Sequence, residues 1–410
     1  MKPILMTLWL AALPALAQQP VLPAGLPPVT TVRPLLERDP AVEAARAHLE
    51  VGEQEARQSE ASPYEWTPRV TRQTRRAEAG LSYGEWNVAV ERGLRLPAKR
   101  SADDKLASAA RAAAKARFGE TLHEAARSFF GLWLDWLTAE HQARLAGASL
   151  QAARDNLAAV EKRQRAGDAA RLDLQLARAD AADQQRAELE ARTAANSAWA
   201  QLSVRYPGLG REVTALPPLT ALSTPERWWR ERILSESDEL KMVQAAAARS
   251  AALAERAHAE QTPDPTVGVF HGSELGGRER LTGISLSVPL PGAARAARGA
   301  RTAAEARVGT FEVALAEREI DARVAAQVAQ AEGSMAAAQV AADSAQAAQA
   351  SAALVQRAYA LGEGDLQTLL AARRQSSAAQ QAALQAQAAA VRAYGLLLVD
   401  AHLVWDLEHD

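Results

Sequence analysis

Two short stretches with the same layout hold the strongest candidates for chemistry in this sequence. Residues 162–178 read KRQRAGDAARLDLQLAR, and residues 357–373 read RAYALGEGDLQTLLAAR. Each stretch interrupts a long Ala-rich, proline-free run at a glycine, follows it with an acidic residue and then resumes a helical pattern. A chain that breaks two long helices in the same way indicates that the turn itself has a role.

Four carboxylates stand at these turns: Asp168, Asp173, Glu363 and Asp365. Repeated around a symmetric pore, such groups form acidic rings that filter cations or gate the pore. Acidic residues near a helix N-terminus also stabilise the helix dipole without any further function. For Asp173 and Asp365 the sequence leaves both roles open.

The glycines at the two turns indicate helix ends and an internal repeat. A helix commonly ends at a glycine in the left-handed conformation, which is the backbone role expected of Gly167 and Gly362. Gly362 follows Gly167 by 195 residues, and at the same offset Leu369 corresponds to Leu174. We interpret the chain as a tandem duplication.

Other residue types that support catalysis or metal binding do not form a recognisable site. The pair His123-Glu124 lacks the second histidine of a zinc-protease helix. His402 and His409 lie near the acidic end of the chain, where a polar tail is favoured over a metal site. We find no phosphate loop and no nucleophile constellation, so we expect no enzyme, no cofactor and no bound metal.

Composition points to an exported helical protein. The 410 residues are 48% apolar but only 5% aromatic, because alanine carries the apolar share. A net charge of −2 gives no basic field for nucleic acid. Residues 1–17 have a short basic start, an apolar core and the cleavage pattern of a secretory signal peptide, before an extension at 18–37. With no cysteine, neither disulfides nor an N-terminal lipid is expected.

The 19 prolines divide the chain and leave residues 98–206 and 292–410 free of proline. Because proline disrupts helix interiors, these two blocks are expected to be the helical bodies. A continuous helix over 98–166 would be roughly 100 Å long. The expected long helices and their returning partners are 98–166 with 170–206, and 292–361 with 365–402.

Alternation of apolar and polar residues predicts strands before each long helix. In 282–290, TGISLSVPL, every second residue is apolar, and 86–96, WNVAVERGLRL, has a similar pattern. Less clear partners are 266–273 and 67–77, the latter with arginines on both faces. The residues expected on the apolar strand faces are Trp86, Val88, Val90, Leu94, Leu96, Ile284, Leu286, Val288 and Leu290.

These elements give two repeats of the same design. The expected parts are repeat 1 at 38–210 with a helix and a β-hairpin at about 66–96, a linker at 211–222, repeat 2 at 223–405 with a helix and a β-hairpin at about 265–290, and a tail at 406–410. The fold class is therefore mainly α with a small β part, built on long antiparallel helical hairpins.

The order of these motifs resembles the outer membrane efflux protein family of TolC-like channels. The pattern R-x-x-A-G-D runs from Arg163 to Asp168, and the Asp-Leu pair at Asp173 and Leu174 follows. The segment SLSVPLPGAARAARGARTAAEA at 285–306 most resembles the heavy-metal, CzcC-like branch. The likeness covers roughly residues 38–405.

The resemblance implies a homotrimer in which each chain gives four strands to a twelve-stranded barrel in the lipids of the outer membrane. The helices then form a periplasmic tunnel whose tip docks a periplasmic adaptor, linked to an inner-membrane efflux pump. The residues it places at the tip, as adaptor contact and gate, are Arg163, Gly167, Asp168, Asp173, Leu174, Gly362, Glu363, Asp365 and Leu369.

The expected function is a passive exit duct of a tripartite efflux system, with heavy-metal cations or small toxic compounds as cargo. An alternative from another class is a periplasmic adaptor or coiled-coil scaffold protein. Adaptors have one helical hairpin flanked by larger β domains, whereas this sequence predicts two hairpins and small β zones.

Overall fold

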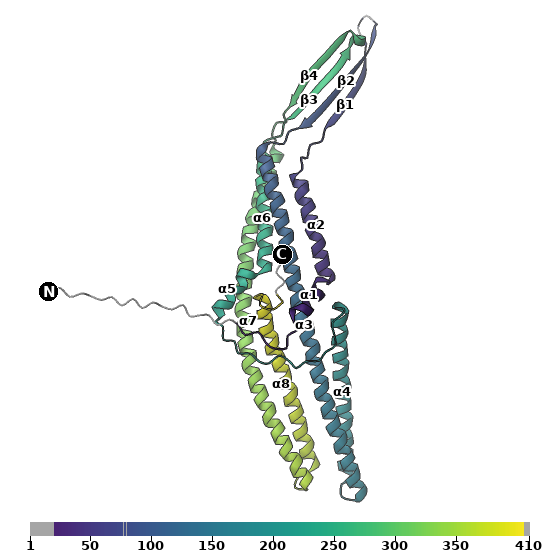
Figure 1. The fold of residues 1–410 in the computed structure, drawn as a ribbon, viewed down its shortest axis with the longest axis vertical. Helices are drawn as coiled ribbons and strands as arrows, with labels where there is room; N and C mark the ends of the chain where they lie inside the picture. Colours follow the sequence, from purple (N-terminus) through teal and green to yellow (C-terminus); the bar gives the residue numbers. More distant parts are fainter. Residues whose placement is uncertain (1–19, 77, 79, 406–410) are drawn as a thin grey trace, which may run out of the picture. The chain divides into compact units, whose positions relative to one another are not determined.

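A computed structural model describes residues 20–76, 78 and 80–405. The expected signal peptide at 1–17, the tail at 406–410 and His409 lie outside the described residues. The elements, in order (Figure 1), are α1 (Val29–Glu37), α2 (Pro40–Glu60), β1 (Thr67–Arg76), β2 (Ser82–Gly93), α3 (Pro97–Ala166), α4 (Arg171–Arg205), α5 (Glu226–Glu236), α6 (Asp238–Ala259), β3 (Thr266–Glu274), the short 3-10 turn η1 (Leu275–Gly277), β4 (Glu279–Ser287), α7 (Ala293–Leu361) and α8 (Leu366–Asp400). The expectation of a mainly helical chain with a small antiparallel sheet is confirmed.

The described residues form two compact units. The hairpin unit contains residues 20–35, 126–236 and 322–405, and the sheet unit contains residues 36–125 and 237–321. Helices α3 and α7 contribute turns to both units. Each unit draws on both halves of the sequence, so neither half folds as a separate domain.

The hairpin unit has an aromatic core despite the low aromatic content of the chain. Ring pairs connect its segments: Phe129 lies 5.1 Å from Tyr206 and 5.3 Å from Trp405 between ring centroids. Its buried aromatic residues include Phe129, Phe130, Trp133, Trp136, Tyr206, Trp229, Tyr394 and Trp405. Burying such large rings supplies stabilisation that alanine seams alone cannot.

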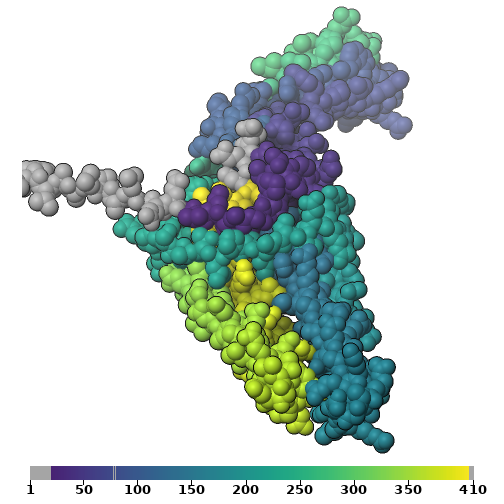
Figure 2. All heavy atoms as spheres, turned by 60° about the horizontal axis from the view of Figure 1, so that its bottom comes forward, coloured from purple at the N-terminus to yellow at the C-terminus, as the bar shows by residue number. Residues whose placement is uncertain are grey.

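An irregular segment at residues 207–225 crosses the two helical hairpins of this unit (Figure 2). His141 of α3 donates to the carbonyl oxygen of Thr214 at 2.8 Å, and Gln387 of α8 donates to that of Pro217 at 3.1 Å. The segment therefore ties α3 to α8 at one level of the unit.

Helix α8 is long and apolar enough, by length and composition, to cross a membrane. However, 44% of its most apolar window is buried inside the protein. Val391, Leu397 and Leu398 are among its buried residues. These three residues belong to the core of the hairpin unit.

Close packing against this core requires a glycine at position 395. A Cβ at Gly395 would overlap the ring of Phe130. We expect Gly395→Ala to lower the free energy of unfolding of the hairpin unit by about 1–3 kcal/mol, the usual cost of overpacking. Urea titration followed by tryptophan fluorescence measures this change. Gly333→Ala in α7 is the control, because a Cβ there meets no neighbour within 4 Å; equal effects of the two variants would contradict the packing argument.

The sheet unit carries one antiparallel sheet in the order β1-β2-β3-β4. The central pairing joins β2 from the first half of the sequence to β3 from the second, with Val90 opposite Val269. Outer pairings place Val70 opposite Val88 and Val269 opposite Ile284. Each half of the sequence thus contributes two strands to the sheet, and β1 and β4 form its edges.

The two faces of the sheet differ in polarity. One face, called here the apolar face, exposes Val70, Val88, Val269, Ile284 and Leu286, with Ile284 85% exposed. The opposite, polar face carries ion pairs between strands: Arg69 with Glu91 at 3.3 Å, and Arg75 with Glu85 at 2.8 Å and Glu274 at 2.9 Å. The register thus places two of the four arginines of β1, Arg69 and Arg75, on the polar face, where each pairs with glutamate.

The strands end earlier than the sequence predicts. β2 ends at Gly93 because the next N–H groups turn to other partners: Leu94 donates to the carbonyl oxygen of Pro265 at 2.8 Å and Leu96 to the carboxylate of Asp264 at 3.0 Å. β4 ends at Ser287, and the prolines at 289 and 291 have no N–H with which to extend it. The assignment of Leu94, Leu96, Val288 and Leu290 to strands was therefore wrong.

Two helix boundaries also differ from expectation. The expected N-terminal extension at 18–37 contains α1, whose Val32 and Leu36 are fully buried. The helix expected from residue 223 is divided in two, because the Ser237 hydroxyl caps a new helix by accepting from the Leu240 N–H at 3.1 Å. The side chain of Asp39 caps α2 in the corresponding place by accepting from the Ala41 N–H.

Candidate functional site

The two helical turns in the hairpin unit have the same backbone geometry. At the first, Gly167 has φ +86° and the Asp168 N–H donates to the carbonyl oxygen of Arg163 at 2.9 Å. At the second, Gly362 has φ +80° and the Glu363 N–H donates to that of Ala358 at 2.9 Å. Both are helix ends of the Schellman type, which satisfy the last helical carbonyls.

Replacing glycine by alanine should have opposite effects on stability at Gly167, which has a left-handed backbone, and at Gly147, which does not. A Cβ in this conformation costs about 1–2 kcal/mol, so Gly167→Ala should destabilise the turn by that amount. Gly147, inside α3, has an ordinary helical backbone and open space around it, so Gly147→Ala should stabilise by about 0.5–1 kcal/mol. Hydrogen exchange of the last turns of α3 distinguishes the two; slower exchange in Gly167→Ala would refute the argument.

Two of the four tip carboxylates act as helix caps. Asp365 accepts from the N–H and the hydroxyl of Thr368, both at 2.8 Å, and the backbone hydrogen bond is the largest cause of its lowered pKa. Asp173 accepts from the N–H of Ala170 at 3.3 Å. Capping therefore accounts for the positions of Asp173 and Asp365.

The other two carboxylates are free for a different role. Asp168 and Glu363 follow the two turn glycines, are exposed, and make no side-chain ion pair or hydrogen bond with the described residues. Two exposed leucines, Leu172 and Leu361, lie close to them in sequence. These leucines are not among the tip residues predicted from the sequence, although their place next to the two turns was a usable signal.

A small apolar cluster, called here the tip cluster, joins the two hairpins just above the turns. It contains Val160, Ala177, Leu366, Leu369 and Leu370, with Leu157, Leu174, Leu176, Val355 and Tyr359 packed against it. In addition, the Arg163 guanidinium lies 5.4 Å from the ring centroid of Tyr359. Of the expected tip residues, Leu369 is buried and Leu174 is half-buried between helices, so both contribute to packing.

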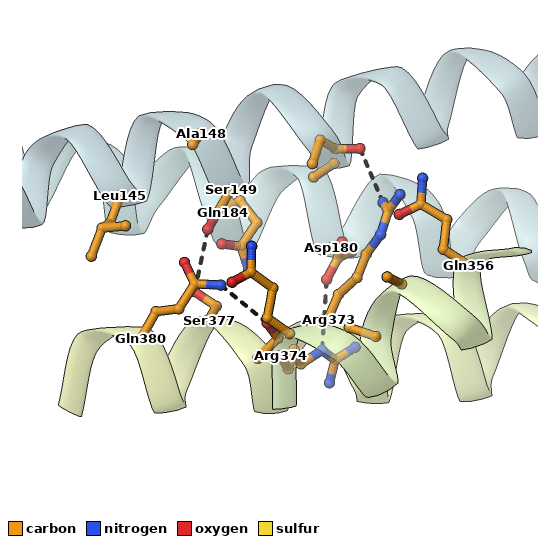
Figure 3. A pocket seen from close by; sticks show the side chains of 16 residues that line it. Leu145, Ala148, Ser149, Asp180, Gln184, Gln356, Arg373, Arg374, Ser377 and Gln380 are labelled. Carbon is orange, nitrogen blue, oxygen red and sulfur yellow. Dashed lines mark hydrogen bonds and ion pairs between the residues drawn. The ribbon is translucent and has the colours of Figure 1, made fainter. Parts of the chain in front are cut away.

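Polar contacts connect the hairpins further along (Figure 3). Arg374 of α8 lies 3.6 Å from the Asp180 carboxylate of α4, and Arg373 donates to the carbonyl oxygen of Ala152 in α3 at 3.1 Å. The hydroxyls of Ser149 and Ser377 are 3.2 Å apart. Each link is weak alone, so separating the hairpins requires breaking several modest contacts together with the tip cluster.

A buried group of charges in the sheet unit, called here the junction cluster, lies where strands meet helices. It comprises Tyr64, Arg95, Lys99, Asp103, Glu260 and Asp264. Asp264 is its centre: its carboxylate accepts from the Tyr64 hydroxyl at 2.7 Å, Lys99 at 3.0 Å and Arg95 at 3.2 Å. Arg95 also pairs with Asp103 at 2.8 Å and with Glu260.

The junction cluster touches every connection between a helix and a strand. Tyr64 precedes β1, Arg95 follows β2, and Glu260 and Asp264 lie between α6 and β3. Arg295, at the start of α7 after β4, donates to the carbonyl oxygen of Glu260 at 2.8 Å. Because partners lie up to 200 residues apart, no local pattern in the sequence reveals them, and none of these residues was predicted to form a site.

Protonation of the junction cluster should weaken it in acid. Burial acts to raise the pKa of Asp264, but hydrogen bonds from Tyr64, Leu96, Lys99 and Arg95 outweigh it and lower that pKa. The stability contributed by a lowered carboxyl pKa is present above its unfolded value, about 4, and is lost as pH falls through the folded value. We expect the urea midpoint of the sheet unit to fall steeply below pH 4; a midpoint unchanged between pH 6 and pH 3 would contradict this.

Comparison with known proteins finds a likeness in the first half of the chain. Residues 32–204 match the sequence pattern of the family described as outer membrane efflux protein. This part of the chain is therefore similar to outer membrane efflux proteins. The family is one of channels and not of enzymes. No curated protein matches the chain.

Solved structures extend the likeness in fold to nearly the whole chain. The outer membrane protein VceC from Vibrio cholerae has a TM-score of 0.73 at 16% identity, with 92% of this chain and 96% of that chain covered. The outer-membrane channel OprN gives 0.71 at 16%, covering 92% and 91%. The open state of the Neisseria gonorrhoeae MtrE outer membrane channel gives 0.67 at 19%, covering 93% and 90%. The fold is therefore that of these outer-membrane channels.

Proposed function

We propose that the whole chain is the outer-membrane channel of a tripartite efflux system, conducting substrate passively from a periplasmic adaptor and an inner-membrane pump to the exterior. The observation that carries the proposal is the four-stranded sheet with one exposed apolar face and one polar face of paired charges. Strands of this kind are typical of a barrel with lipid outside and water inside.

Aromatic side chains border the apolar face. Its apolar side chains run along β4 from Leu286 through Ile284 to the row of Val88 and Val70, four residues or roughly 14 Å. The apolar band of outer-membrane barrels is likewise bordered by aromatic residues. Trp66 and Trp86, both exposed, supply aromatic side chains at the two ends of this band.

Several polar and charged residues also lie on the apolar face, and those described next are compatible with this position. The His271 Nδ1 and the Thr282 hydroxyl are 2.7 Å apart, and the His271 ring lies 5.6 Å from that of Trp86. Arg72 is opposite Trp86 in the register and Arg76 opposite Ser82, both toward the β1–β2 turn. A basic side chain near a membrane interface costs about 0–1 kcal/mol, far less than at the midplane.

Closure of the barrel requires further copies of the chain. Strands β1 and β4 are the edges of the sheet, and unpaired edges cannot face lipid because their N–H and C=O groups would be unsatisfied. Three copies, each with four strands, would close a twelve-stranded barrel. We therefore include a homotrimer in the proposal.

The helical tips are the proposed gate and the contact with the adaptor. In a trimer Asp168 and Glu363 would form acidic rings, and the exposed Leu172 and Leu361 beside them would offer apolar contacts. Arg163 and Leu174 of the first turn and Leu369 of the second would hold the tips together in the closed state. Acidic rings suit cationic cargo, and we extend the proposal to heavy-metal cations or small toxic compounds on the likeness of residues 285–306 to the heavy-metal branch.

Cross-linking tests the proposed barrel. The chain has no cysteine, so introduced pairs report without background. Thr71→Cys in β1 should be combined in turn with Leu281→Cys, Gly283→Cys and Ser285→Cys in β4, all on the polar face. We expect at least one pair to yield covalent trimers in isolated outer membranes, with no trimers from single variants. Monomers alone from every pair, or recovery of the protein in the soluble fraction, would favour the adaptor or scaffold alternative.

Deletion of the protein tests the cargo. The expected result is increased sensitivity to zinc, cobalt or cadmium, restored by the wild-type chain. Unchanged metal tolerance together with increased sensitivity to organic toxicants would overturn the heavy-metal assignment and retain the channel.

A further inference from the structure

A cavity of about 370 Å³ lies within the hairpin unit, between α3, α4, α7 and α8 (Figure 3). One water molecule takes about 30 Å³ of liquid volume, so the cavity has room for a small organic molecule. Part of its wall is apolar, with Leu145, Ala148 and Ala352, and the remainder is polar, with Gln184 and Gln380. An amphipathic ligand fits such a lining better than a purely apolar one.

The charge in this cavity is not balanced. Arg373 is half-buried and forms no ion pair with the described residues; it donates instead to the neutral carbonyl oxygen of Ala152. Asp180, which is 7% exposed, pairs with the other arginine, Arg374. Two guanidinium groups and one carboxylate leave a net positive charge on the lining.

Burial of the Arg373 guanidinium makes its charge energetically unfavourable. Burial is the largest cause of the lowered pKa of Arg373, and Asp180 and Asp155 oppose it only through space. A guanidinium offers several N–H donors in a planar fork that matches a carboxylate. A half-buried cation without an ion-pair partner is stabilised when an anion binds to it.

We propose that this cavity binds a small organic carboxylate, with its anionic group on Arg373 and its apolar body against the alanine and leucine wall. Ser149 and Ser377, whose hydroxyls lie 3.2 Å apart on the cavity wall, provide further donors. The ligand contacts all four helices of the two hairpins at once.

The consequence of binding rests on the proposed function. If the hairpins must separate to open the channel, a ligand that bridges them stabilises the closed state and acts as an inhibitor. The site would then give small organic acids control over an exit duct whose proposed cargo is cationic. Binding itself does not depend on conduction, so the two can be tested separately.

Calorimetric titration of the full mature chain in nanodiscs tests the binding site, with 3-phenylpropanoate and its neutral amide as probes. We expect the carboxylate to bind at least tenfold more tightly than the amide. Arg373→Gln should weaken carboxylate binding at least tenfold, whereas Arg186→Gln, an exposed arginine of α4 outside the cavity, should leave it unchanged. Equal affinity for acid and amide, or full affinity in Arg373→Gln, would overturn the proposal.

A second variant covers the case in which Arg373→Gln fails to fold. Ala353 lines the cavity from an exposed position, so Ala353→Leu reduces the space without changing charge. We expect it to weaken binding of the acid; undiminished binding in the folded variant would contradict the assigned site. If the acid binds but the inserted protein does not conduct ions, the proposed binding site is supported and the proposed channel function is contradicted.

Discussion

Replacing Asp264 by asparagine should lower the free energy of unfolding of the sheet unit by about 3–5 kcal/mol, the cost of breaking a buried ion pair. Lys99 is 1% exposed and Arg95 is nearly as buried, so neither cation can turn to water when Asp264 is neutralised. Lys99 then keeps Glu260 as its carboxylate partner, and Arg95 keeps Asp103 and Glu260. The substitution keeps the size of the side chain, which confines the effect to charge and hydrogen bonding. Urea titration followed by hydrogen exchange of β2 and β3 measures the loss.

A matched control separates buried from exposed charges. Glu255 pairs with Lys105 at 2.5 Å, but both side chains are more than half exposed. Glu255→Gln should change stability by less than about 1 kcal/mol, as usual for a surface ion pair. Similar losses in Asp264→Asn and Glu255→Gln would contradict the role of the junction cluster.

Shortening Leu369 to alanine should open the proposed channel. Leu369 is fully buried in the tip cluster between the hairpins. Leucine-to-alanine changes in a core cost about 2–5 kcal/mol. If that cost falls on the closed arrangement alone, the ratio of open to closed channels rises at least tenfold. Conductance of the purified protein in planar bilayers measures this ratio.

Leu189→Ala is the control for this prediction, since Leu189 of α4 is 55% exposed. It should leave conductance within about twofold of wild type, because an exposed leucine contributes little packing. A conductance of Leu369→Ala no higher than that of the control would show that the tip cluster does not hold a gate closed.

The helical part of the fold was accessible from sequence because its signals are local. Proline is excluded from helix interiors, so the two long proline-free blocks indicate α3, α4, α7 and α8. A glycine that ends a helix needs no distant partner, which is why Gly167 and Gly362 could be recognised. The same locality explains why α1 was missed: its burial depends on partners that its own sequence does not specify.

Features of the fold that depend on contacts between distant residues could not be predicted from the sequence. The end of β2 depends on Asp264 and Pro265, far along the chain, which accept the N–H groups of Leu96 and Leu94. The faces of β1 became clear only from its register with β2, which pairs Arg69 with Glu91. The expected roles of the tip residues in docking and gating remain predictions.

Chemical labelling of two adjacent residues in β4 tests the central claim most directly. Ile284 lies on the apolar face and Ser285 on the polar face, where its hydroxyl lies close to Gly268. In isolated outer membranes, a water-soluble maleimide should label Ser285→Cys at least tenfold faster than Ile284→Cys. After denaturation both should react equally. Equal labelling of the two sites in intact membranes would contradict a sheet that faces lipid on one side and a water-filled channel on the other.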